Sequence, residues 1–356
     1  MVASAAALLD RACAAAGSSD LGTGDWRVGR DRLVAAVEHD VTDPDAVGRI
    51  EALVVERLVQ RLRIEAWYAD HPDEVGGPVA APVIVFGLPR TGTTALHHLL
   101  SIDPRFRYLR SWELKDPVDP RRPTEAPAAD VRHIVTIDGP AEDWPIHAMA
   151  FDHAELVLPV PSYTAWWRER SHTDVMAFHE RVLRLLQHDR PSRRWLLKLP
   201  SYLFLLDEVA ARYPDARFVM THRDPVPTMA STCSTVADSR RQRIPTWQPD
   251  AGFGAGLLEH WSVGMALALV ARATIREDRF VDVTQAELEA DPVATATRVL
   301  DHAGLALDPS VADEMAAWAA ANRRGARGTH AYSLDEYGLD PARVEAAFAP
   351  YLERFG

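Results

Sequence analysis

The residues best suited to hold an anion stand at positions 87–94, which read Gly-Leu-Pro-Arg-Thr-Gly-Thr-Thr. A short apolar run precedes this segment and apolar residues at helical spacing follow it, so we expect a turn from a strand into a helix. Such a turn points backbone N–H groups and a helix N-terminus at one place, where Thr91, Thr93 and Thr94 add hydroxyl donors. The segment predicts a phosphate or sulfate site. An ordinary strand-to-helix turn with threonine caps is the alternative.

The loop lacks the lysine that magnesium-dependent nucleotide chemistry needs. A nucleotide-hydrolysing P-loop has the pattern GxxxxGK[ST], in which the lysine reaches the β and γ phosphates. Gly87 and Gly92 have that spacing, but Thr93 occupies the lysine position and the cation of the loop is Arg90. Because a guanidinium can bind two oxygens of one phosphate or sulfate, we expect an anion site without triphosphate and magnesium chemistry.

Four short apolar runs, at 83–86, 195–198, 217–221 and 280–283, form the framework that positions this loop. Each is followed by a helical pattern, and strands that alternate with helices form parallel sheets buried on both faces. The sequence therefore predicts an α/β fold, a P-loop-like doubly wound parallel sheet flanked by helices. Ligands bind at the carboxyl edge of such sheets, so functional residues should follow the strands.

Two helical regions are expected around the sheet. Residues 1–75 indicate an N-terminal helical extension packed on the core, in which Asp43 and Pro44 are typical of an N-cap and first helical residue. Residues 76–356 would form the α/β domain. Within it, residues from about 115 to 190, rich in Pro and Trp, indicate a largely helical insertion over the active site.

Composition excludes several classes of protein. Of the 356 residues, 47% are hydrophobic and 25% charged, which permits a large core and excludes a disordered chain. The net charge of −12 disfavours a nucleic-acid partner, so any bound anion must be held by a local pocket. The two cysteines, Cys13 and Cys233, have no metal-ligand spacing, and no metal is expected.

The distribution of apolar residues also predicts where in the cell the protein is located. No run approaches the ~20 uncharged apolar residues that a membrane span needs. The apolar N-terminus lacks a basic region before it and is interrupted by Asp10 and Arg11, which indicates an amphipathic helix rather than a signal peptide. We expect a cytoplasmic protein without an integral membrane segment, and the sequence leaves open whether it forms a homo-oligomer.

A second polar block follows the third apolar run. It reads Thr-His-Arg-Asp-Pro, and Ser231 lies eight residues after Arg223. Asp224 and Pro225 are typical of an N-cap and first helical residue. Ser231 would then lie about two turns into the helix, near enough for Arg223 and Ser231 to share one phosphate.

Together these motifs resemble the sulfotransferases that use 3′-phosphoadenosine 5′-phosphosulfate (PAPS). The segment 87–94 looks like their 5′-phosphosulfate loop, and the spacing of Arg223 and Ser231 is the one they use on the 3′-phosphate. A third block, Arg323, Arg324 and Gly325 with the three residues after it, resembles their RxGxxG element, which closes over the same phosphate. The wider pattern looks most like bacterial members that act on small or lipid-like acceptors.

The resemblance implies PAPS as donor, PAP as product and no metal. It assigns donor binding to residues 90–94, namely Arg90, Thr91, Gly92, Thr93 and Thr94, together with the three 3′-phosphate elements. Cytosolic members carry a tryptophan after the threonine pair that stacks on adenine. This chain has Ala95 there, which leaves the adenine contact open.

Sulfuryl transfer is an in-line displacement that must stabilise charge on the leaving phosphate. Arg90, the loop amides and Thr94 are the candidates. Residues 196–200 resemble a strand-end lysine segment of tyrosylprotein sulfotransferases, so Lys198 would bridge sulfuryl and phosphate oxygens. A lysine that merely caps a strand edge is the alternative.

A base must also take a proton from the acceptor. The resemblance to tyrosylprotein sulfotransferases points to Glu113, which lies 23 residues after Arg90 with Trp112 beside it to lower the local polarity. On this hypothesis Glu113→Gln keeps donor affinity and lowers turnover by ~10² or more. A solvated Glu113 is the alternative, and the rival bases are four histidines: His97, His98, His147 and His153.

The acceptor site is expected in the insertion, whose aromatic and apolar residues suit an apolar pocket. The candidates are Trp144, Met149, Phe151, Tyr163 and Trp166, with a plain core role as the alternative. Such a pocket would take an apolar alcohol, phenol or lipid. The arginine-rich run 240–243 is interpreted as a solvated helix end or loop, with contact to an acidic acceptor as the minor alternative.

The amino-acid sequence leaves two other functions open. A P-loop kinase-like phosphotransferase would require magnesium-dependent ATP turnover despite Thr93. A non-catalytic protein of the same fold would bind PAP or another nucleotide without depending on Glu113 or Lys198.

Overall fold

The computed structural model describes residues 2–72, 76–125, 136–188, 190, 193–323 and 333–356. Its centre is a five-stranded parallel sheet in the order β2-β3-β1-β4-β5. The strands are β1 (Val83–Gly87), β2 (Phe106–Arg107), β3 (Arg194–Lys198), β4 (Arg217–His222) and β5 (Phe280–Thr284). Four of them confirm the four apolar runs. The sequence analysis missed β2, whose two residues are too few for a periodic pattern.

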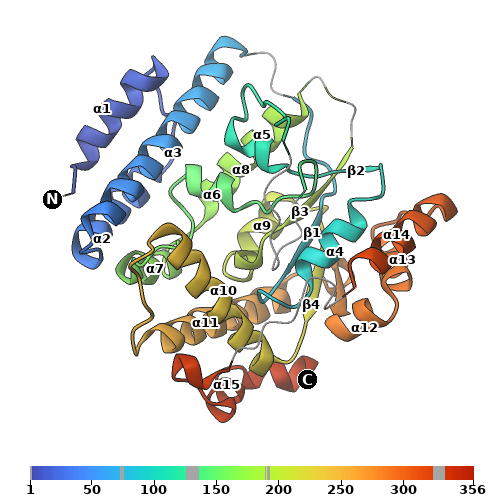
Figure 1. Ribbon diagram of the computed structural model, residues 1–356. Coiled ribbons are helices and arrows are strands. Elements are labelled where there is room, and N and C mark those ends of the chain that lie inside the picture. The colour runs from blue at the N-terminus through green and yellow to red at the C-terminus, as the bar shows by residue number, and fades with distance from the viewer. Residues whose placement is uncertain (1, 73–75, 126–135, 189, 191–192, 324–332) are drawn as a thin grey trace.

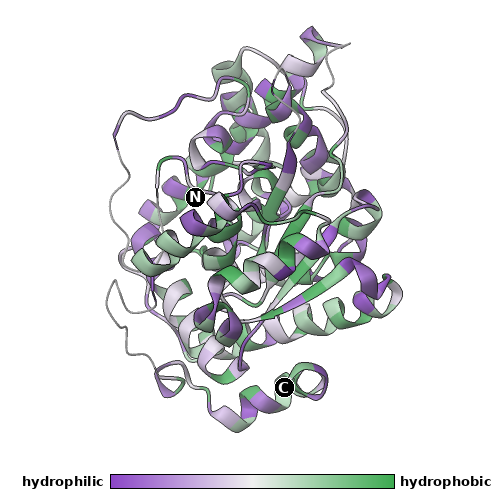
Figure 2. Cartoon of the chain, turned by 90° about the vertical axis from the view of Figure 1, so that its right-hand side faces the viewer, coloured by the Kyte–Doolittle hydropathy of each residue, from purple (hydrophilic) through white to green (hydrophobic). Residues whose placement is uncertain are grey.

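β1 is the central strand, and all five of its residues are buried. Ile84 and Phe86 belong to one hydrophobic cluster, whereas Val83 and Val85 belong to the other, as the two-residue period of a strand requires. The strands are accordingly largely hydrophobic, with hydrophilic residues mainly near their ends (Figure 2). A strand buried on both faces places its carboxyl end in the interior of the molecule, where a ligand can be enclosed.

Helices cover both faces of the sheet, which confirms the doubly wound α/β prediction (Figure 1). One layer contains α4 (Thr93–Leu100), α12 (Gln285–Ala290), α13 (Pro292–His302) and α14 (Pro309–Ala321). The other contains α8 (Thr173–Gln187), η1 (Pro200–Leu203), α9 (Leu206–Arg212), α10 (Pro225–Arg243) and α11 (Phe253–Thr274). The short helix η2 (Glu277–Arg279) directly precedes β5. The C-terminal part contains η3 (Asp335–Tyr337), α15 (Pro341–Ala347) and α16 (Ala349–Phe355).

The N-terminal region is helical as expected, with α1 (Ala5–Ala16), α2 (Trp26–Asp40) and α3 (Pro44–Asp70). Asp43 caps α3 by accepting hydrogen bonds from the backbone N–H groups of Asp45 and Ala46. Val54 and Leu58 of α3 lie in the same core cluster as Ile84 of β1. The N-terminal layer therefore shares the core of the α/β part.

The region between β2 and β3 carries the short helices α5 (Ser111–Lys115), α6 (Trp144–Met149) and α7 (Pro161–Arg168), followed by α8. α6 packs against α3 and α8, and α7 packs against α2. These contacts tie the insertion to the N-terminal helices. The two regions together build the wall that faces the carboxyl edge of the sheet.

Within the described ranges, α11 is the one helix long and apolar enough to cross a membrane by length and composition. Half of its apolar window is buried, and it packs against α9 and η1. It also contains Arg272, whose guanidinium donates to the carboxylate of Asp282 at 2.7 Å. These contacts are those of a core helix.

Candidate active site

The loop between β1 and α4 lies at the carboxyl end of the central strand. Gly87 has a φ of +145°, and a Cβ there would lie 2.6 Å from the carbonyl oxygen of Thr221 on β4. Gly92, at φ +96°, is the N-cap of α4. Arg90 also adopts a positive φ, of 69°, which costs a non-glycine residue about 1–3 kcal/mol and is typical of ligand-binding loops.

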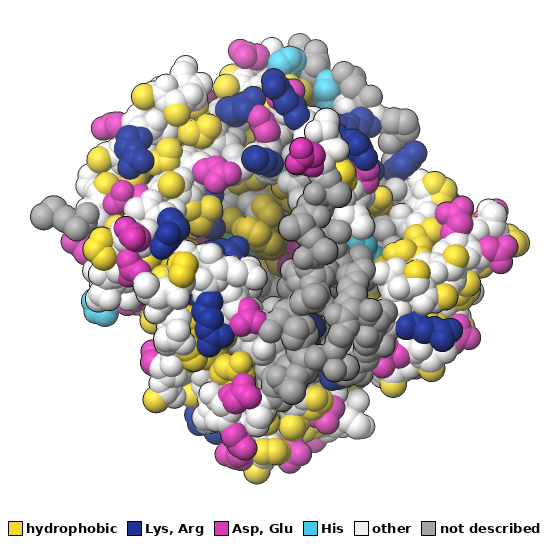
Figure 3. Space-filling model, in the orientation of Figure 1, with side chains coloured by type: hydrophobic (Ala, Val, Ile, Leu, Met, Phe, Trp, Pro, Cys, Tyr) yellow, Lys and Arg dark blue, Asp and Glu magenta, His cyan; other side chains and the backbone are white. Residues whose placement is uncertain are grey.

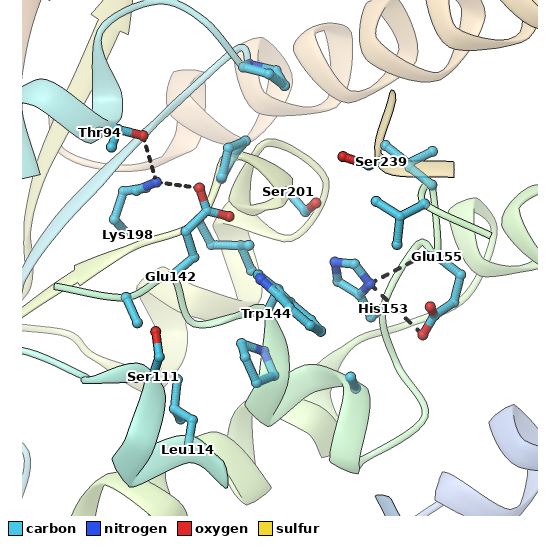
Figure 4. A pocket seen from close by; sticks show the side chains of 18 of the residues that line it. Thr94, Ser111, Leu114, Glu142, Trp144, His153, Glu155, Lys198, Ser201 and Ser239 are labelled. Atoms are coloured by element: carbon cyan, nitrogen blue, oxygen red, sulfur yellow. Dashed lines mark hydrogen bonds and ion pairs between the residues drawn. The ribbon is translucent and has the colours of Figure 1, made fainter. Parts of the chain in front are cut away.

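The three threonines of the loop have different environments. Thr91 is buried, and its hydroxyl lies 2.7 Å from the carbonyl oxygen of Leu88 and 2.5 Å from the hydroxyl of Thr221. It therefore braces the loop against β4. Thr93 and Thr94 open α4 and line a cavity, and the hydroxyl of Thr94 accepts from Lys198 (Figure 4).

The second polar block lies beside this loop because β4 is the neighbour of β1. Arg90 Nε donates to Ser231 Oγ at 3.1 Å, and Arg223 Nη1 donates to the carbonyl oxygen of Arg90 at 3.1 Å. Asp224 caps α10 by accepting from the N–H of Val226, as the sequence predicted. The two groups of candidate anion-binding residues thus form one continuous site.

The third block falls largely outside the described residues. Arg323 lies just after α14 and is exposed, whereas Arg324 and Gly325 are not described. Its closure over the site stays a prediction.

Lys198 lies at the carboxyl end of β3 and is buried. Its ammonium group donates to Thr94 Oγ1 at 3.1 Å and forms an ion pair with the carboxylate of Glu142 (Figure 4). This places a cation beside the first turn of α4, and it also places a carboxylate there.

Asp143 holds Glu142 in this position. The N–H of Lys198 donates to Asp143 Oδ1 at 3.2 Å, and the N–H of Asp143 donates to the carbonyl oxygen of Lys198 at 3.1 Å. The hydroxyl of Tyr202 donates to the other carboxylate oxygen of Asp143. Asp143 is fully buried, so these hydrogen bonds fix the residue before it against the end of β3.

A cavity of about 760 Å³ adjoins the loop. It is lined at one end by Thr93, Thr94 and Lys198, and it extends past Trp144 to His153 and other polar groups (Figure 4). The space-filling view shows this face hollowed near its centre, with hydrophobic side chains gathered in the hollow (Figure 3). The arrangement joins an anion site to an enclosed space for a second, partly apolar molecule.

Comparison with known proteins agrees with this geometry. A model of the sulfotransferase family matches residues 82–309, which include the sheet, the loop and the second polar block with Arg223 and Ser231. The chain belongs to the sulfotransferase family.

Two crystal structures of mycobacterial sulfotransferases resemble this sulfotransferase along almost its entire length. STF1 from Mycobacterium tuberculosis H37Rv is 29% identical with a TM-score of 0.84, and the match covers 98% of this chain and 99% of that one. STF9 from Mycobacterium avium is 27% identical with a TM-score of 0.90, covering 99% and 97%. No curated protein matches the sequence.

Glu113, the base suggested by the sequence, does not line the cavity of this sulfotransferase. Its side chain is fully buried, and one carboxylate oxygen accepts from Arg107 at 3.2 Å and from Arg190 at 2.7 Å. The guanidinium of Arg110 is 3.6 Å away. The geometry is that of a buried ion cluster, and a catalytic role for Glu113 stays a prediction that these contacts do not favour.

The four candidate histidines divide into two groups. His97 and His147 are buried outside the cavity, and burial lowers the pKa of both well below the ordinary value. His98 and His153 do line the cavity. Burial lowers the pKa of His153, which keeps its ring neutral at pH 7, but Trp144 separates it from Lys198 (Figure 4).

The proposed acceptor residues are mostly core. Met149, Phe151 and Tyr163 are buried in the main hydrophobic cluster and Trp166 packs against it, whereas Trp144 lines the cavity. The apolar wall is instead formed by side chains from several elements: Leu53, Leu114, Trp144, Leu156, Val236 and Trp261. The insertion is rich in aromatic residues, but burial in the core accounts for most of its rings.

Glu142 is the functional candidate that the sequence analysis missed. Asp143 and Pro145 are typical of a helix start, but nothing in the local sequence indicates that the carboxylate of Glu142 reaches Lys198. Within the described ranges, no cluster of three or more His, Cys, Asp or Glu side chains could hold a metal ion.

Proposed function

We propose that this sulfotransferase transfers the sulfuryl group of PAPS to a hydroxyl or amine of a small, largely apolar acceptor. The observation that supports PAPS most directly is the contact of Arg90 with Ser231 and Arg223. It joins the loop suited to a 5′-phosphosulfate with the pair suited to a 3′-phosphate. A donor with anionic groups at both ribose positions accounts for both sets of donors at once.

In this proposal the loop amides, Arg90 and Thr94 bind the phosphosulfate, and Lys198 stabilises the charge that develops on the leaving oxygen. The acceptor oxygen attacks sulfur in line while the bond from sulfur to the phosphate oxygen breaks, which releases PAP. The acceptor proton goes to Glu142, the carboxylate nearest Lys198 among the cavity residues. Removing a donor such as Lys198 costs on the order of 3 kcal/mol of transition-state stabilisation.

No metal is required in this scheme. Arginine and lysine side chains supply the positive charge that magnesium supplies to a nucleotide-hydrolysing P-loop, and Thr93 stands at the position of the P-loop lysine. The apolar walls of the cavity favour an alcohol, phenol or lipid-like acceptor over a glycan.

Calorimetric titration tests the donor. The wild-type protein is titrated with PAP and with ATP, each in EDTA and in magnesium, and Arg223→Ala is titrated in parallel. We expect PAP binding that is independent of magnesium and is weakened in Arg223→Ala. Magnesium-dependent ATP binding without PAP binding would instead support a kinase-like phosphotransferase. PAP binding with no sulfuryl transfer to any acceptor would indicate a non-catalytic binding protein.

A further inference from the structure

The arginine-rich run at the end of α10 places its three arginines in different environments. Arg240 donates to the carbonyl oxygen of Leu156 at 2.8 Å and lies over the ring of Trp247. Arg241 pairs with Asp238, one turn earlier, at 3.1 Å. Arg243 lines the same cavity as Lys198. The run is therefore not a uniformly solvated helix end, because Arg243 lines the cavity.

Arg243 lacks a carboxylate partner in the part of the chain that the structure describes. Its guanidinium donates to the carbonyl oxygen of Ser239 at 3.2 Å, and none of the described carboxylates lies within ion-pair distance. Arg243 is half-buried, and its pKa is lowered by burial, with Glu155 acting in the opposite direction. A guanidinium removed from water in this way has unused hydrogen-bond donors directed at the cavity.

Glu155, the nearest candidate to neutralise Arg243, is already paired. Both of its carboxylate oxygens accept from Arg57 of α3, at 2.6 and 3.2 Å, and both side chains are buried. Glu155 has a positive φ of 52°, a strained conformation that the surrounding structure must hold. His153 beside it has a pKa lowered by burial. This end of the cavity therefore contains a guanidinium, that of Arg243, that is paired with none of the described carboxylates.

Arg243 lies far from the transfer centre. It is twelve residues after Ser231 on α10, and twelve helical residues span about 18 Å. Ser231 in turn contacts Arg90 of the loop before α4. In Figure 4, Ser239 and Glu155 lie on the opposite side of Trp144 from Thr94 and Lys198. Trp144 lies between the two ends (Figure 4), and Leu156 and Val236 are further apolar residues of the lining.

We propose that the natural acceptor is an amphipathic hydroxy acid. Its hydroxyl lies at Lys198 and Glu142, its apolar body lies along Trp144, and its carboxylate or other anionic group binds Arg243. This proposal rests on the proposed function for the hydroxyl end only, since the binding of the anionic end can be measured without catalysis. A simple role for Arg243 as a cap of α10 is the competing explanation.

The test uses ω-hydroxylaurate and its neutral methyl ester, which share a hydroxyl and an apolar chain and differ in charge. Binding of each to the full chain is measured by calorimetry, and sulfuryl transfer to each is measured with PAPS. The variants are Arg243→Ala and, as a matched control from the same helix end, Arg241→Ala. We expect the wild type and Arg241→Ala to prefer the acid, and Arg243→Ala to bind the acid about tenfold or more weakly while its affinity for the ester is unchanged.

The outcomes separate the two proposals. Equal affinity of the wild type for acid and ester, or an equal loss for both in Arg243→Ala, overturns the hydroxy-acid proposal even if PAPS is the donor. Arg243-dependent binding of the acid without any transfer supports the anionic subsite at Arg243 and overturns the proposed function. Arg243→Lys guards against a folding defect, because it keeps the charge and should restore part of the preference for the acid.

Discussion

Glu142 and Lys198 form an ion pair at the carboxyl end of β3, although 56 residues separate them in the chain. The buried carboxylate of Asp143 makes this possible by bonding to the backbone of Lys198. The pair brings a carboxylate and an ammonium group to the one place where the phosphate loop, the sheet edge and the acceptor cavity meet. It is the basis of the first prediction.

Glu142→Gln should lower kcat for sulfuryl transfer by ~10², the scale of a lost general base, while leaving the Kd for PAP unchanged. The amide keeps the size of the side chain but has no basic oxygen. Turnover with PAPS and a phenolic acceptor, together with calorimetry of PAP, measures both quantities. Glu56→Gln, which removes an exposed carboxylate from the rim of the same cavity, is the matched control. An unchanged kcat in Glu142→Gln would return attention to His98 and His153.

Glu113→Gln should act mainly on stability. Removing this buried carboxylate leaves the guanidiniums of Arg107, Arg110 and Arg190 close together without an anion between them. Breaking a buried ion pair from one side costs about 3 kcal/mol or more, so the free energy of unfolding should fall by that amount. Denaturant unfolding measures it. Full stability with turnover reduced ~10² would support the catalytic role inferred from the resemblance.

Ser231→Ala should weaken PAP binding by about tenfold, since one hydrogen bond to a charged group contributes about 1.5 kcal/mol. Ser231 is buried beside Arg90, where its hydroxyl accepts from the guanidinium. Ser239→Ala, two turns later on the same helix, should leave PAP affinity unchanged. Isothermal calorimetry compares the two, and equal affinities would remove Ser231 from the donor site.

The loss of folding stability at acid pH should depend on His260. Its ring is fully buried among Phe204, Trp261 and Trp167, and this burial lowers its pKa well below the ordinary value of about 6.5, with Arg168 adding to the effect. As pH falls below about 6.5 the unfolded chain binds a proton that the folded chain does not. The stability that neutral His260 contributes is therefore present above that pH and is lost progressively toward its lower folded pKa.

His260→Phe should consequently reduce the slope of unfolding free energy against pH in the acid range by up to about 1.4 kcal/mol per pH unit. Urea unfolding at a series of pH values measures the slope. A slope in His260→Phe equal to that of the wild type would show that the folded and unfolded chains protonate His260 equally readily, which would contradict the prediction.

The sheet and the phosphate loop follow from local sequence. Continuous apolar runs specify buried parallel strands, and Asp-Pro pairs specify the starts of α3 and α10, because capping and strand burial depend on neighbours in the chain. The loop could also be predicted from the spacing of Gly87 and Gly92 and from Thr93 at the P-loop lysine position, because these features too lie close together in the chain. Arg223 and Ser231 could be paired because both lie on one strand-to-helix unit.

The acceptor end of the site depends on packing between distant segments. No local sequence pattern around Glu142 predicts its contact with Lys198. Arg243 lines a cavity only because residues of α3 and α6 form other parts of the wall. Aromatic residues such as Phe151 and Tyr163 are of a type that often lines pockets, but here they are buried in the core. Burial of large rings stabilises a fold wherever they lie. Local patterns thus specify the sheet and the loop between β1 and α4, whereas long-range packing settles which carboxylate and which cations face the cavity.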